Sequence, residues 1–178
     1  MADTLYNQAL DSNNGGWNGY TTVMKYTTAA LTLPSYSIAR MRVRFEAGTV
    51  EGLTITNAYV GHKAASGDVY DFASTPVQLL FSGAAGVAIS TSSTATSDWA
   101  NFAYDKTSDL IIAFYINGGT GVDTARAKAG LSNTVLYYAI ANEAGTVNKS
   151  AGYTASSGLG FAVNFIEVES GNSSNFFF

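Results

Sequence analysis

Alternating apolar and polar positions predict a succession of β-strands along most of the chain. The clearest case is Ile38–Glu46, where small and apolar side chains alternate with arginines. One face would carry Ala39, Met41, Val43 and Phe45, and the other Arg40, Arg42 and Arg44. Strand patterns also cover residues 17–28, 50–63, 76–83, 86–90, 133–141 and 158–168. No segment shows a convincing helical period.

The segment around which the rest is organised spans residues 98–119 and predicts a hairpin. Phe102 and Tyr104 would share one face of its first arm. Residues 105–109 (Asp-Lys-Thr-Ser-Asp) supply a turn, because Asp and Ser side chains hydrogen-bond their own backbone. The second arm, Leu110–Ile116, is apolar on both faces, which is typical of a central strand covered on both sides.

The sequence predicts local details of two further strands. The segment 50–63 predicts a strand with a bulge near Asn57. In the segment 158–168, alternation would turn every second apolar side chain inward. These inward residues would be Leu159, Phe161, Val163 and Phe165.

Many short strands separated by turn residues predict an all-β fold in one domain of 178 residues. We expect an antiparallel β-sandwich, jelly-roll-like, with an up-and-down barrel as the alternative. Residues 1–16, which end in Asn-Asn-Gly-Gly, would form an N-terminal arm or linker, although residues 4–10 also fit a first strand. The sandwich would span 17–169, followed by a tail at 170–178. Small-residue stretches at 90–97, 120–132 and 145–158 are interpreted as loops.

The amino-acid composition and net charge disfavour several classes of partner. Charged residues make up only 12% of the chain, about half the usual share, which suits packing against neighbours better than dilute solution. The net charge of −4 disfavours nucleic-acid or anionic-membrane partners. The sequence has no cysteine, which excludes disulfides and thiol chemistry and gives no information on the redox compartment. It has no apolar run near the ~20 residues of a membrane span and no signal-peptide pattern, so we expect synthesis in the host cytoplasm.

Residues suited to catalysis are few. His62 is the single histidine, and no Gly-x-Ser-x-Gly elbow occurs, so a nucleophilic triad lacks its parts. Asp68 with Asp71, or Asp98 with Glu143, could form a glycosidase carboxylate pair, but turn and capping roles are the simpler interpretation. We therefore expect no enzyme activity, no cofactor and no metal.

Arg40, Arg42 and Arg44 would form a positive stripe on an acidic protein. Such a stripe suits an interface with a carboxylate-bearing subunit or an anionic glycan. The alternative is a solvated face neutralised by acids on adjacent strands.

Aromatic residues offer a second candidate surface. Trp17, Tyr20 and Trp99 lie beside turns, and Tyr137 and Tyr138 are consecutive in a strand. Rings at such positions can stack on sugars, so they are candidate glycan-binding residues. Packing in the core or at an interface is the alternative.

Three consecutive phenylalanines, Phe176, Phe177 and Phe178, follow a polar linker. In a monomer they would form an exposed apolar patch. They would either fold back onto their own domain or dock into a neighbouring chain, and the unpatterned linker favours the neighbour.

Several short motifs resemble a known module. They are Tyr-Val-Gly-His at 59–62, Tyr-Asp-Phe at 70–72, Pro-Val-Gln-Leu at 76–79, and Ser-Asp at 97–98 followed by an aromatic strand, Tyr-Asp and a hydrophobic strand. This pattern, spread over residues 50–168, resembles a β-sandwich module of tailed-bacteriophage structural proteins, found in tail fibres, spikes and capsid-attached fibres. The resemblance implies an architecture and a virion setting, and no catalytic motif comes with it.

Together these features predict a non-enzymatic virion protein, either a capsid decoration protein or a tail or fibre component. It would assemble with itself, as a trimer in our expectation, and with other capsid or tail proteins. The alternative function is a carbohydrate- or host-receptor-binding module that recognises a host-surface glycan.

Overall fold

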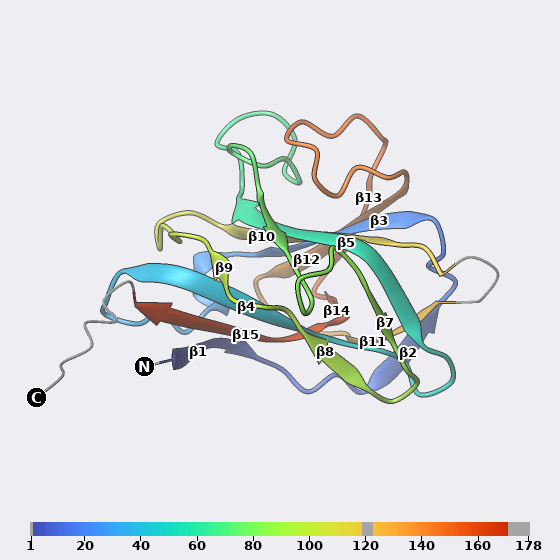
Figure 1. Ribbon diagram of the computed structural model, residues 1–178. Coiled ribbons are helices and arrows are strands. Elements are labelled where there is room, and N and C mark those ends of the chain that lie inside the picture. Colours follow the sequence, from blue (N-terminus) through green and yellow to red (C-terminus); the bar gives the residue numbers. More distant parts are fainter. Residues whose placement is uncertain (1, 119–122, 171–178) are drawn as a thin grey trace, which may run out of the picture.

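The computed structural model describes residues 2–118 and 123–170, and it is an antiparallel β-sandwich (Figure 1). One sheet has the order β1 (Ala2–Asn7), β15 (Val163–Ser170), β4 (Ile38–Glu46) and β8 (Thr94–Thr96), with β9 (Ala100–Asn101) also paired to β4. The other has the order β13 (Thr154–Ser157), β12 (Thr134–Ile140), β3 (Tyr20–Tyr26), β10 (Leu110–Ile116), β5 (Leu53–His62) and β6 (Val77–Leu79), with β7 (Val87–Ile89) also paired to β5. A small sheet joins β14 (Gly160–Phe161), β11 (Thr124–Lys128) and β2 (Ser12–Gly15), and a short 3-10 helix spans Thr28–Ala30. The predicted all-β fold is confirmed.

The main core lies between the two large sheets. From β4, Met41, Val43 and Phe45 point into it, and all three are fully buried. From β10, Phe114 meets Phe45 edge to face, with ring centroids 5.2 Å apart. The predicted apolar face of Ile38–Glu46 is therefore the face that covers the second sheet.

β10 is central and covered on both sides, as its doubly apolar sequence predicts. It lies between β3 and β5. Its outward side chains Ile111 and Ala113 are fully buried in a second cluster, which also contains Val23, Phe72, Tyr137 and Ala144. Residues 63–76 and 141–153, here named the cover loops, lie over this side of the sheet (Figure 1).

The predicted hairpin at 98–119 is wrong. β9 pairs with β4 in the first sheet, whereas β10 belongs to the second. The intervening chain crosses between the sheets, and Phe102 and Tyr104 are buried beside the main core, 7% and 4% exposed. A local pattern of strand, turn and strand does not reveal whether the second arm returns to the first arm or joins another sheet.

The N-terminal residues belong to the sheets. β1 pairs with β15 and β2 pairs with β11, so of the two alternatives for residues 4–10 the strand applies to residues 4–7. β8, β11 and β13 lie in the three small-residue stretches that were interpreted as loops. Small side chains carry little periodic signal, because they pack by allowing close approach rather than by burying large apolar groups.

The last strand shows how a local irregularity reverses alternation. Phe161 and Val163 are buried as predicted, but Phe165 is only half-buried and faces outward. Ala162 has a φ of 58°, and the pairing with β4 shifts between Val163 and Phe165. Ile166 and Val168 therefore face the core instead. In β5, a register shift at 55–57 confirms the bulge predicted near Asn57.

Candidate functional site

The fold brings three of the five predicted stacking aromatics together at one end of the sandwich. Trp17 lies in the turn before β3, Tyr20 begins β3, and Tyr138 lies in β12. Ring centroids are 5.4 Å apart for Trp17 and Tyr20, and 5.1 Å apart for Trp17 and Tyr138, in edge-to-face arrangements. These distances and angles are those that aromatic pairs prefer.

The position of Trp17 is determined by the turn that carries it. Gly16 and Gly19 have φ values of 86° and 83°, which glycine adopts without strain. The indole Nε1 donates a hydrogen bond to Asn14 Oδ1 at 3.1 Å, and the ring packs against Phe161 with centroids 4.5 Å apart. Trp17 is therefore a fixed wall, 8% exposed, rather than a mobile surface ring.

Beside these rings lies a hollow of about 200 Å³, lined by Gly15, Gly16, Trp17, Tyr20 and Tyr138. Ile140 is paired directly with Tyr20 across β12 and β3, and strand alternation places it on the same side as Tyr138. Its side chain is 76% exposed, the highest value among the exposed large apolar residues. Trp17, Tyr20, Tyr138 and Ile140 are named the aromatic end below. The sequence contains no signal for the role of Ile140, because it depends on register with Tyr20.

The other two predicted stacking residues lie elsewhere. Tyr137 points to the opposite side of β12, 7% exposed beneath the cover loops, with its ring 5.6 Å from that of Tyr70. Trp99 lies on the outer face of the first sheet, where the Arg42 guanidinium carbon is 4.6 Å from its ring centroid. A second hollow, of about 260 Å³, is lined by Val77, Gln78, Leu80, Asp98, Trp99, Ala100 and Asn101.

The arginine row is paired within the chain. Arg40 contacts Glu169 at 2.8 Å, and Arg42 contacts Glu167 at 2.6 Å. The third, Arg44, donates from Nε to the side-chain oxygen of Asn164 at 2.8 Å. All three acceptors lie on the adjacent strand β15, which matches the alternative of a neutralised face. The Arg40 and Arg42 side chains remain 40% and 37% exposed, and their contact with a partner stays a prediction.

His62 has a structural setting. Its Nε2 accepts a hydrogen bond from the backbone N–H of Asp105 at 2.8 Å. The ring lies 4.8 Å from that of Phe102 and stacks on Tyr104 at 5.5 Å. Burial lowers the pKa of His62, opposed by the nearby Asp105 carboxylate. The histidine thus anchors the crossover between the sheets.

The carboxylates weighed as a glycosidase pair each hold backbone amides. Asp71 accepts the N–H groups of Lys149 and Asp68, at 2.8 and 3.1 Å. Asp98 accepts those of residues 82 and 83, at 3.2 and 2.8 Å. Glu143 accepts those of residues 150 and 151, at 3.2 and 3.1 Å. These contacts are loop-stabilising ones, as the turn interpretation predicts.

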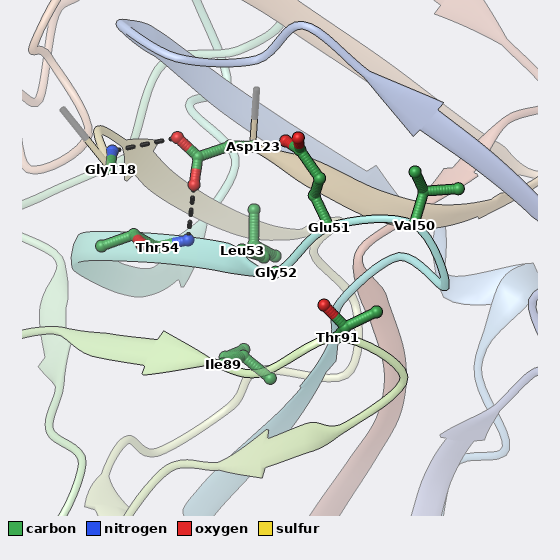
Figure 2. Close-up of a pocket in the computed structure, with 9 residues that line it drawn as sticks. All are labelled: Val50, Glu51, Gly52, Leu53, Thr54, Ile89, Thr91, Gly118 and Asp123. Atoms are coloured by element: carbon green, nitrogen blue, oxygen red, sulfur yellow. Dashed lines mark hydrogen bonds between the residues drawn. The ribbon is translucent and has the colours of Figure 1, made fainter. Parts of the chain in front are cut away.

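A third hollow, of about 360 Å³, lies at the start of β5 (Figure 2). Asp123 holds the two sides of this hollow together, because its two carboxylate oxygens accept hydrogen bonds from the backbone N–H groups of Thr54 at 2.8 Å and Gly118 at 2.9 Å. Asp123 is 5% exposed. A Cβ at position 118 would lie 2.7 Å from its Oδ1, so this approach requires glycine.

Asp123→Asn is expected to lower the free energy of unfolding by about 1 to 2 kcal/mol, because one of the two backbone N–H groups loses its acceptor. Urea unfolding followed by tryptophan fluorescence measures the change. Glu51→Gln is the matched control, since Glu51 lies exposed on the rim of the same hollow. Equal stability of the two variants would show that Asp123 does not brace this end.

Comparison with known protein families finds no matching family model, and comparison with curated proteins finds no match. Within the described part of the chain, no cluster of three or more His, Asp or Glu side chains is arranged to hold a metal ion. Across the same residues, no helix is long and apolar enough to cross a membrane. The class that the fold and site define is an antiparallel β-sandwich with an aromatic end.

Proposed function

We propose that the protein is a non-enzymatic structural component of a bacteriophage particle, a capsid decoration protein or a tail or fibre component, and that it acts by assembling with itself. The observation that carries the proposal is the aromatic end, where Ile140, 76% exposed, is the cross-strand neighbour of Tyr20, one of three aromatic residues that line a hollow. Aromatic residues are enriched at the centres of protein interfaces, which are more apolar than the rest of the surface.

The structural roles of His62, Asp71, Asp98 and Glu143 support a non-enzymatic function. Each of these side chains accepts backbone N–H groups that hold a loop or a crossover in place. The residues that acid–base chemistry would use therefore already have stabilising tasks.

The virion setting rests on the motif resemblance. Within these motifs, Asp71 and Phe72 join the cover loops to the second sheet, and His62 stacks on Tyr104. The motif residues thus build the scaffold. The resemblance therefore concerns architecture.

Light scattering on the full chain and on a chain ending at Asn175 tests the proposal. We expect a discrete oligomer of 18.7-kDa chains, three in our expectation, that loses mass when Phe176, Phe177 and Phe178 are removed. These residues lie outside the described part of the structure. The control keeps the three phenylalanines and replaces Ser173 and Ser174 with glycine. A monomeric full chain would contradict assembly.

A second candidate function is glycan binding, favoured by the same hollow. Trp17, Tyr20 and Tyr138 surround a space next to two glycines, where a sugar ring could approach the backbone closely. A monomeric full chain in the scattering experiment would direct the search to this function.

A further inference from the structure

We infer that the aromatic end receives the Phe176–Phe178 segment of a second copy, so that copies join end to end. The inference rests on the proposed self-association and names the two surfaces that would meet. Within the described part of the chain, Ile140 at the aromatic end is left 76% exposed.

The size and chemistry of the hollow suit an aromatic ring. The hollow of about 200 Å³ is open, has room for one aromatic ring and is lined by Trp17, Tyr20 and Tyr138. Trp17 already packs edge to face with Tyr20 and with Tyr138, and a further ring would extend this arrangement. The exposed Ile140 beside it would cover a second phenylalanine.

The described chain ends far from this hollow. Trp17 packs against Phe161, just before β15 begins, and Val163 pairs with Phe45. At the other end of β15, Ser170 pairs with Ile38. Seven residue steps of a strand cover about 23 Å. In Figure 1 the arrowhead of β15 accordingly lies on the opposite side of the molecule from β2 and β11.

The linker is too short for the segment to return to its own hollow. Phe176 follows Ser170 by six residues, which reach at most about 21 Å even when fully extended, and Phe178 follows it by eight, which reach about 28 Å. The path back needs a reversal of the chain, which takes at least two residues. The six residues that remain before Phe178 reach about 21 Å, less than the ~23 Å length of β15. A second copy placed against the β15 terminus has no such limit.

A contact between one end of a chain and the opposite end of the next is heterologous. It closes into a ring if the rotation permits and otherwise continues as a filament. A ring of three would agree with the expected trimer.

Cysteine cross-linking tests the inference without background, because the chain contains no cysteine. One full-length variant carries Ile140→Cys and another, with a distinguishable tag, carries Phe177→Cys. After mixing and mild oxidation, we expect the 140–177 heterodisulfide to exceed the control pair at least five-fold. The control pairs Phe177→Cys with Val69→Cys, since Val69 is 44% exposed on a cover loop.

The outcomes separate the inference from the proposed function. An oligomer in which the 140–177 disulfide does not exceed the control, or in which 177–177 disulfides dominate, overturns the inference and leaves self-association standing. Ile140→Asp gives an independent readout, because an exposed position tolerates the change in the fold. We expect at least ten-fold weaker association, and unchanged association would overturn the inference.

Discussion

Asp71→Ala is expected to loosen the cover loops and to lower the free energy of unfolding by about 3 kcal/mol, because the buried N–H group of Lys149 and the part-buried N–H group of Asp68 lose their acceptor. The change also removes the carboxylate whose charge contributes most to stabilising the buried ammonium group of Lys149. That lysine is 4% exposed and donates to the carbonyls of Tyr70 at 3.1 Å and Thr146 at 3.0 Å, so it ties one cover loop to the other.

Amide hydrogen exchange shows which segments are destabilised in Asp71→Ala. Residues 63–76 and 141–153 should lose protection, while β10 retains it, since the main core does not depend on Asp71. Asp98→Ala is the matched control, because Asp98 also accepts two backbone N–H groups but is exposed, and those groups belong to residues 82 and 83, outside the cover loops. Unchanged protection of both cover loops in Asp71→Ala would contradict the role assigned to Asp71.

The free energy of unfolding is expected to rise between about pH 8 and pH 10. Burial lowers the pKa of Lys149 to about 8, against the opposing charges of Asp71 and Glu143. In the unfolded chain a lysine keeps its proton to about pH 10.4, so above pH 8 the unfolded state binds more protons. Stability then increases with pH, by about 2 to 3 kcal/mol at most.

Tyrosines limit this rise on the alkaline side. Burial raises the pKa of Tyr6 to about 12 and that of Tyr104 further, so above about pH 10 the folded state retains protons that the unfolded state releases. Stability then falls. Urea unfolding at a series of pH values should show a maximum near pH 10. Lys149→Met should abolish the rise in the free energy of unfolding between about pH 8 and pH 10. Lys128→Met, which removes a surface lysine paired with Asp11, should preserve that rise. An unchanged rise in Lys149→Met would refute its attribution to Lys149.

Strands with strong local patterns were predictable. Every residue of Leu110–Ile116 is aliphatic or aromatic, so both faces of the strand are apolar. Only a central strand that is covered on both sides satisfies that pattern. Ile38–Glu46 shows clean alternation, and its arginines face outward as expected. What covers β10 on its outer side was not predictable, because the cover loops are far apart in sequence and meet through Lys149 and Asp71.

The candidate site was predictable only in part. From the sequence, Trp17, Tyr20 and Tyr138 are candidate stacking residues, and Tyr137 and Trp99 are equally strong candidates. The pairing of β3 with β12 separates them, since it places Tyr138 and Ile140 on one side and Tyr137 on the other. Ile140 had no local signal at all.

The class of fold and the apolar faces of the long strands follow from the amino-acid sequence alone, because they depend on the periodicity of apolar positions. The structure is needed to establish that the chain between β9 and β10 crosses between the sheets, that β15 ends opposite the aromatic end, and which rings share a hollow. These features depend on pairing between strands far apart in the sequence, such as Ala2 of β1 with Glu169 of β15, and no local pattern encodes such a partner.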